Sequence, residues 1–403
     1  MVYPRLREGR RGSGQRWLKV GAVMIPLAIP NLAGRESQYL QECVSTNFVS
    51  SVGPFVDRFE KELAQKVGAN FAVSTSSGTT ALHLALTVLG VRHNDLVILP
   101  SFTFIASANS ISHCGAMPWL FDVDEGSWTI SVAQLERVLE EKTKIESGRV
   151  IHKITGQRVA AIMPVYTLGT APEMSAIRKV ADKYKLPVIA DAAAALGATY
   201  HHEQLGDLAD LTAFSFNGNK IITSGGGGMI VGNNEALMKR AKHLCTTARV
   251  SEDYLHDEVG FNYRMTNVGA ALGCAQLELL DKFLNKKREI ARKYRAAFLN
   301  LNDVSCFPMP AWSESACWFS GVVLGKKWEV KKVCEQLKVK GIAARPFWMP
   351  IHLQPPYAHA LRESLSTTES FWRGILTLPC STSLTEKDQD YVIHTLQNIL
   401  RET

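Results

Sequence analysis

The chain has 403 residues, 46% of them hydrophobic, and a formal net charge of +7. This length allows one large domain and a smaller one. The sequence contains no apolar run of about 18 residues, so a membrane span is not predicted. The charge does not indicate nucleic-acid binding, because residues 1–23 hold six basic residues against one acidic residue and the remainder is nearly neutral. The Gly- and Arg-rich segment 1–23 is predicted to be a disordered basic arm, with a targeting or anionic-surface role as the alternative.

Short β-rich runs alternate with amphipathic helical patterns through the middle of the chain, which predicts an α/β fold with a parallel sheet. The expected strands are residues 71–74, 96–100, 119–123, 159–165, 187–191, 211–216 and 229–231. The expected helices are 79–89, 132–141, 171–184 and 235–244, followed by a long connector helix over about 267–299. These patterns predict a large domain over 24–265 and, over 266–403, the connector with a small C-terminal α+β domain.

A turn rich in Ser, Gly and Thr follows the first of these strands. It reads Ser77-Gly78-Thr79-Thr80 and runs directly into a helical pattern. Free N–H groups at a helix start suit a phosphate group. Ser and Thr are also ordinary helix caps, so the turn alone does not decide between the two roles.

Two further elements carry an acid and a lysine. Asp191 ends a buried strand, where ligands of open α/β sheets bind, although such a residue can also cap a following helix. Lys220 lies between a strand and the four-glycine run 225–228. A phosphate turn, a carboxylate for a pyridine nitrogen and an amine for an imine together fit pyridoxal 5′-phosphate, PLP. The eight cysteines are scattered without a C-x-x-C pair, which argues against a metal site or a disulfide framework.

Five stretches resemble, in order, the DegT/DnrJ/EryC/StrS family of sugar aminotransferases within the fold-type I PLP enzymes. They are residues 77–83, 100–104, 191–193, 214–216 with Lys220, and 260–264, and the resemblance covers 24–403. It implies a large, mixed, mostly parallel seven-stranded sheet domain with a smaller C-terminal α+β domain. Stretches 47–53, 217–222 and 352–357 look like the branch of the legionaminic acid and bacillosamine pathways.

The resemblance also implies roles for individual residues. Lys220 would form the Schiff base with PLP and transfer protons, and Asp191 would bind the pyridine nitrogen. The other expected PLP contacts are Gly78, Thr79 and Ser215 at the phosphate, Phe104 stacked on the ring, and Asn262 at the phosphate of a neighbouring subunit. A homodimer with shared active sites would follow.

The expected substrate contacts are Asn47, Phe48, Val49, Ser50, Arg264, Arg345, Trp348 and His352. A packed aromatic segment with a buried histidine is the alternative for the last three, and a structural turn is the alternative for Asn262 and Arg264. Ala194 departs from the family, because many relatives carry Gln, His or Glu there. This predicts a site beside the cofactor that is less polar than in those relatives.

The implied reaction is the transfer of an amino group from L-glutamate to C4 of a nucleotide-linked 4-keto-6-deoxy sugar. A UDP-2-acetamido-2,6-dideoxy-4-keto-hexose is the expected acceptor, in the cytoplasmic synthesis of surface glycans, with no membrane or nucleic-acid partner. A sugar dehydratase of the same family is one alternative, but those relatives carry histidine where Lys220 stands. A PLP-binding regulator is the other, and no helix-turn-helix pattern supports it.

Overall fold

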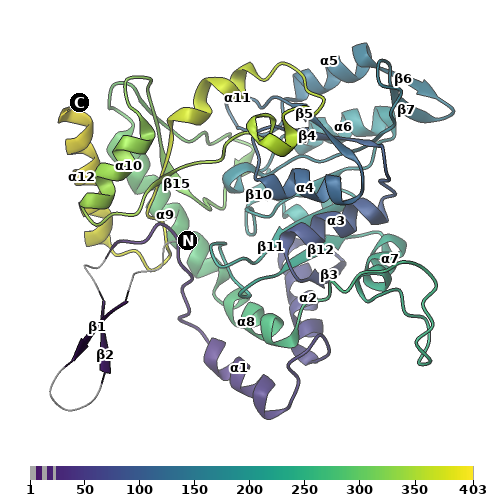
Figure 1. The fold of residues 1–403 in the computed structure, drawn as a ribbon, viewed down its shortest axis with the longest axis horizontal. Helices are drawn as coiled ribbons and strands as arrows, with labels where there is room; N and C mark the ends of the chain where they lie inside the picture. Colours follow the sequence, from purple (N-terminus) through teal and green to yellow (C-terminus); the bar gives the residue numbers. More distant parts are fainter. Residues whose placement is uncertain (1–5, 11–15, 21–23, 403) are drawn as a thin grey trace.

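The computed structural model describes residues 6–10, 16–20 and 24–402 (Figure 1). Strands β1 (Leu6–Arg10) and β2 (Arg16–Val20) pair antiparallel. The disorder expected for 1–23 falls in part on residues outside the described ranges, and it stays a prediction. Among the described residues, no helix is both long and apolar enough to cross a bilayer.

Seven strands form the central sheet. They are β3 (Phe71–Thr75), β4 (Leu96–Pro100), β5 (Met117–Phe121), β8 (Val159–Ile162), β9 (Ile189–Asp191), β11 (Leu211–Ser215) and β12 (Gly228–Gly232). The order is β3-β12-β11-β9 and β8-β4-β5, and parallel bridges at Ile162–Val188 and Val165–Asp191 join the two parts. Of these seven strands, β12 alone runs opposite in direction to the other six. The predicted mixed, mostly parallel seven-stranded sheet is confirmed.

Helices cover both faces of this sheet because its strands are apolar on both sides. Along β4, Leu96 and Ile98 face one hydrophobic core while Val97 and Leu99 face the other. Helices α3 (Gly78–Val88), α4 (Ile105–His113) and α7 (Glu235–Cys245) pack on the second face. The first face is covered by α2 (Pro54–Val67), α5 (Val132–Lys142) and α6 (Met174–Tyr184) (Figure 1).

The expected long connector is two helices, α8 (Asn267–Leu277) and α9 (Leu280–Phe298). The backbone leaves helical geometry at Leu279, where φ is −103° and ψ is 2°. The two halves pack on different partners: α8 contacts α2 and α1 (Glu36–Ser45), whereas α9 contacts the C-terminal sheet. The break lets each half turn its apolar side to its own neighbour.

A second, antiparallel sheet occupies the C-terminal part in the order β13-β15-β17-β16. Its strands are Val304–Cys306, Ser320–Leu324, Ile375–Leu378 and Arg345–Pro346 in that order. Helices α10 (Val330–Val339) and α12 (Glu386–Glu402) accompany it, and the short α11 (Ser366–Phe371) precedes β17. We propose that these elements and α9 form the smaller domain predicted from residue 266 onward. Four short strands complete the fold: β6 (Thr143–Glu146), β7 (Arg149–His152), β10 (Thr199–Tyr200) and β14 (Ser313–Glu314).

Candidate active site

The chemistry-bearing residues come together at the carboxyl ends of neighbouring strands. Strands β9 and β11 are parallel, with Asp191 opposite Ala213, so Asp191 and Ser215 leave the sheet at the same edge. Ser215 is also paired with Gly228, at the start of β12. This edge is where an open α/β sheet forms a ligand site.

The predicted phosphate turn is the N-terminus of α3. Ser77 caps this helix: its Oγ accepts from the Thr80 N–H at 3.1 Å, and Thr80 Oγ1 accepts from the Ser77 N–H at 3.0 Å. The N–H groups of Gly78 and Thr79 lie between these two, in the first turn, where a helix offers N–H groups to an anion. A Cβ on Gly78 would lie 2.8 Å from Ser215 Cβ and 3.1 Å from its Oγ. Only glycine leaves this cradle open, and its donors fit a phosphate.

Asp191 is buried and held by two hydrogen bonds. Its Oδ2 accepts from Ser107 Oγ at 2.6 Å, and its Oδ1 accepts from the Ala193 N–H at 3.1 Å. Burial raises the pKa of this carboxyl, while Ser107, the Ala193 N–H and the charge of Lys220 act in the opposite direction. Ser107 in turn lies 2.8 Å from the hydroxyl of Thr103. The carboxylate is therefore oriented and supplied with donors, as a partner for a ring nitrogen requires.

Lys220 lies in the turn after β11, near enough to Asp191 for the charge of that residue to act on its amine. Burial lowers the pKa of Lys220 to about 8, and the negative charge of Asp191 partly offsets that shift. The Nζ atom lies 3.7 Å from the centre of the Trp318 ring. A lysine with a lowered pKa has a larger share of neutral amine near neutral pH, which suits imine formation.

Two more aromatic side chains belong to the same region. Phe104 occupies the position just before α4, its side chain is half exposed, and its ring centre lies 6.0 Å from that of Trp348. The ring centres of Trp348 and Trp318 lie 5.8 Å apart. Phe104 was predicted as a cofactor contact and Trp348 as a substrate contact, and the fold brings the two together. Lys220 lies next to the ring of Trp318.

Asn262 and Arg264 lie on the segment that runs beside the end of β3. Asn262 forms a bridge with Thr246, and Arg264 forms one with Thr75. The carbonyl of Tyr263 accepts from the Ser76 N–H at 2.7 Å, so within one chain this segment adjoins the phosphate turn. The buried Nε of Arg264 has no hydrogen-bond partner in the described part of the chain, and its Nη2 lies 3.6 Å from Asp57 Oδ1.

The predicted substrate segment Asn47 to Ser50 follows α1. Asn47 has a left-handed backbone with φ of 62°, and the side chains of Phe48 and Val49 are exposed. The carbonyls of Phe48 and Ser50 accept from Asn267, at the start of α8. These contacts hold the segment near α8, at the lower edge of the molecule in Figure 1.

Arg345 and His352 occupy different environments. The guanidinium carbon of the exposed Arg345 lies 5.3 Å from the centre of the Phe319 ring, next to Trp318. His352 is buried, with Nδ1 2.7 Å from Ser101 Oγ and Nε2 3.2 Å from Glu369 Oε1. Burial lowers the pKa of His352. These contacts favour the alternative of a packed histidine, and its role as a substrate contact stays a prediction.

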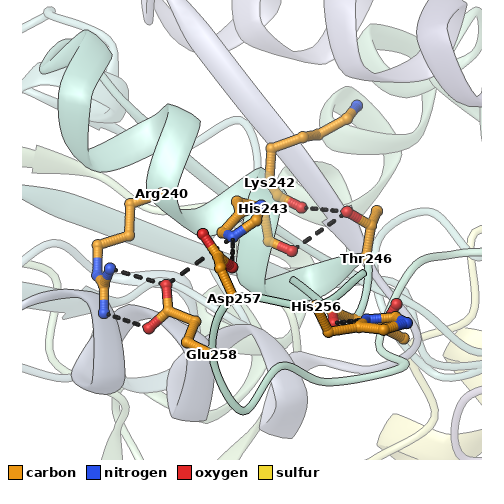
Figure 2. Close-up of polar contacts among 8 residues, drawn as sticks. Arg240, Lys242, His243, Thr246, His256, Asp257 and Glu258 are labelled. Atoms are coloured by element: carbon orange, nitrogen blue, oxygen red, sulfur yellow. Dashed lines mark hydrogen bonds and ion pairs between the residues drawn. The ribbon is translucent and has the colours of Figure 1, made fainter. Parts of the chain in front are cut away.

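A polar cluster ties the loop that precedes the Asn262 segment to α7 (Figure 2). His243 Nε2 lies 2.7 Å from Asp257 Oδ1, and Arg240 contacts both carboxylate oxygens of Glu258 at 3.0 Å. His243, Asp257 and Glu258 are close enough to surround one cation. Because Arg240 already neutralises Glu258, we interpret the cluster as an anchor for the loop.

Sequence reasoning missed two residues of this site, Ser107 and Trp318. Ser107 follows the predicted stretch 100–104 by three residues, and its position one helical turn from Thr103 was the available signal. Trp318 lies almost 100 residues after Lys220, and nothing in the local pattern connects the two. Ala194, the departure from the family pattern, is buried just beyond Asp191.

A mixed seven-stranded sheet with a phosphate cradle, a buried acid and a lysine at one edge defines the class of fold-type I PLP enzymes. The profile of the DegT/DnrJ/EryC1/StrS aminotransferase family matches residues 30–397. The chain therefore belongs to that family, and it is a PLP-dependent sugar aminotransferase.

Curated relatives and solved structures agree with this assignment. The chain is 40% identical to the GDP-perosamine synthase of Caulobacter vibrioides over 93% of this chain and 98% of that protein. It is 32% identical to the UDP-4-amino-4,6-dideoxy-N-acetyl-beta-L-altrosamine transaminase of Campylobacter jejuni, over 87% and 91% of the two chains. The crystal structure of a DegT DnrJ EryC1 StrS aminotransferase from Brucella abortus superposes with a TM-score of 0.83 at 28% identity, covering 91% and 95%.

Proposed function

We propose that the enzyme transfers an amino group from L-glutamate to C4 of a nucleotide-linked 4-keto-6-deoxy sugar. The observation that carries the proposal is the position of Asp191, at the end of β9, and of Lys220, in the turn after β11, at the sheet edge that also holds the Gly78–Ser215 cradle. The names of the relatives support a sugar acceptor, and one of them specifies a 4-amino-4,6-dideoxy product.

The residues of the cradle and of the buried acid would bind and orient the cofactor. The N–H groups of Gly78 and Thr79 and the hydroxyl of Ser215 would hold its phosphate, and Phe104 would lie against its ring. Asp191 would keep a proton on the ring nitrogen, since an ionised carboxylate stabilises a nearby positive charge. Bound PLP supplies an electron-accepting ring that makes the Cα proton of an amino acid acidic.

Lys220 would have two roles. It would bind the cofactor covalently and, when released, accept the proton from the donor's Cα and deliver one to C4 of the sugar. A pKa of about 8 suits both directions, because neither protonation state of the amine is then strongly favoured near neutral pH.

The sugar nucleotide would lie beside the aromatic side chains and the segments predicted for it. Arg345 and Arg264 are cations suited to a diphosphate, and Trp348 offers a face to a sugar or base ring. We propose a UDP-2-acetamido-2,6-dideoxy-4-keto-hexose as the acceptor, in the synthesis of surface glycans of the legionaminic acid or bacillosamine type. The similarity to GDP-perosamine synthases makes a GDP-linked acceptor the alternative to be tested.

We also infer a homodimer in the cytoplasm, with Asn262 reaching the partner's phosphate site. The anchored loop presents exposed apolar side chains at Val250, Tyr254, Leu255 and Val259, and such a patch favours a protein contact. The eight cysteines are free thiols, as is usual in a reducing compartment.

The test is a screen of GDP- and UDP-linked 4-keto-6-deoxy sugars with L-glutamate, in which formation of 2-oxoglutarate is followed. We expect turnover with one nucleotide class and an amino sugar product by mass spectrometry. Consumption of the sugar without glutamate, with loss of water, would instead support the dehydratase alternative. Absence of 2-oxoglutarate with every acceptor would overturn the proposal.

The Lys220→Ala variant tests whether Lys220 binds the cofactor and is required for turnover. The variant should lose both the imine absorbance of the bound cofactor and turnover, while circular dichroism remains unchanged. Lys326→Ala, which removes an exposed lysine from the loop after β15, should behave like the unaltered enzyme. Transamination by the Lys220→Ala protein would contradict the assignment.

A further inference from the structure

Trp318 contacts Lys220 in two ways. Its ring centre lies 3.7 Å from Lys220 Nζ, and its indole N–H donates to the carbonyl of Asn219 at 2.6 Å. The ring therefore touches the amine of the lysine and is hydrogen-bonded to the residue just before it. The indole cannot turn away without losing the bond to Asn219.

The indole itself is firmly held. Trp318 is only 4% exposed, and its carbonyl accepts from the buried amine of Lys287 at 2.8 Å. The backbone N–H of Trp318 donates to the carbonyl of Leu168 at 3.1 Å. A residue from the C-terminal part of the chain is thus fixed against the edge of the large sheet, and its ring face is available to Lys220.

We propose that Trp318 is a positioning residue that holds the Lys220 ammonium whenever this lysine is not bound to the cofactor. The proposal rests on the proposed function, in which Lys220 alternates between a covalent bond to PLP and a free amine. A long, flexible lysine released into the site needs a defined place from which to transfer a proton. The face of an indole ring, negative in its quadrupole, attracts an ammonium group.

The electrostatic surroundings explain why such a contact matters. Burial disfavours the charged amine, and Asp191 is the charged group that acts against this effect. In the proposed function Asp191 is engaged with the ring nitrogen of the cofactor, so it cannot also hold the ammonium closely. The Trp318 ring supplies a second attraction that leaves Asp191 in place.

Fluorinated tryptophan tests the attraction without changing the shape of the ring. Fluorine withdraws electron density, so the full chain would be produced with tryptophan, 5-fluorotryptophan or a difluoro analogue at its eight tryptophans. Acylation of Lys220 in the cofactor-free protein would be measured against pH by mass spectrometry, which reports the neutral amine. We expect the midpoint to fall stepwise with fluorination. A midpoint that does not move would overturn the proposal.

Substitutions test the residue itself. Trp318→Leu should lower the acylation midpoint by about one pH unit, roughly a tenfold faster reaction below the midpoint, and Trp318→Phe should lower it less. Trp328→Leu is the matched control, because Trp328 is similarly buried and its ring centre lies 4.2 Å from another lysine amine, Lys327 Nζ. Its Lys220 midpoint should equal that of the unaltered protein.

The outcomes separate this inference from the proposed function. Acylation requires neither substrate nor turnover, so an enzyme of another specificity would still show the shift. If Trp318→Leu does not fold, the acylation midpoints of the fluorinated proteins and of Trp318→Phe still show whether the ring holds the ammonium. Equal midpoints in Trp318→Leu, Trp318→Phe and Trp328→Leu would mean that the ring does not hold the ammonium, whatever the reaction proves to be.

Discussion

The buried bond from Ser107 to Asp191 should be important for turnover. Ser107 is the donor that lowers the pKa of Asp191 most, so Ser107→Ala should raise that pKa further and weaken the partner of the cofactor ring. We expect turnover to fall by roughly ten- to a hundredfold, the worth of a hydrogen bond to a buried charge, with cofactor content retained. Steady-state kinetics should place the loss in kcat.

Ser110→Ala is the control for this change. Ser110 is equally buried on the same helix, but its hydroxyl donates to the carbonyl of Ser107 at 2.7 Å and does not bond to Asp191. Similar kcat values for the two variants would show that the hydroxyl of Ser107 has no special role.

The lowered pKa of Lys220 predicts a pH dependence of cofactor capture. Only the neutral amine attacks an aldehyde, so the rate of imine formation by the cofactor-free chain should rise with pH and level off above a midpoint of about 8. The negative charge of Asp191 raises the pKa of Lys220, so Asp191→Asn should move the midpoint to lower pH. Stopped-flow absorbance measures both rates, and a midpoint near that of an exposed lysine would contradict the burial argument.

The loop after α7 should depend on its anchor. Arg240→Gln removes the two contacts to Glu258 and should expose the loop to chymotrypsin near Tyr254, with cleavage about two- to fivefold faster, the range of an exposed ion pair. Lys239→Gln is the matched control, because Lys239 pairs with Glu235 one turn back in the same helix. Equal cleavage of the two variants would mean that Arg240 does not hold the loop.

The elements themselves were partly readable from sequence. The strands of the large sheet could be predicted because each is a short apolar run. A strand buried on both faces is apolar at nearly every position and does not alternate between apolar and polar residues. The break at Leu279 was not predicted, since the Leu- and Lys-rich pattern continues across it. The break follows from two separate packing partners, which a local pattern does not record.

The assembly can be tested by mixing two inactive proteins. If Asn262 completes the partner's site, a heterodimer of Lys220→Ala with Asn262→Ala/Arg264→Ala contains one pocket with both defects and one with neither. Mixing should then restore up to about a quarter of normal activity, the statistical share of intact pockets after free exchange. Tagged pull-down verifies the exchange. Heterodimers without activity would show that each chain uses its own Asn262 or none.

The sequence alone predicted the PLP cofactor and the edge of the sheet that we propose holds it, and the family resemblance predicted the aminotransferase reaction. Asp191 ends a recognisable strand, the Gly78 turn and Lys220 each follow one, and the carboxyl ends of parallel strands lie at the same edge of a sheet. These inferences needed only local pattern and chain order.

The contacts between distant segments needed the folded chain. Trp318 reaches Lys220, and His352 is enclosed by Ser101 and Glu369, because packing of the C-terminal part against the large sheet brings them together. Such contacts depend on how complete surfaces fit, and no short stretch of sequence carries that information. The same packing, and not the residue types, distinguishes an aromatic ring that faces the amine of Lys220 from one that only fills the core.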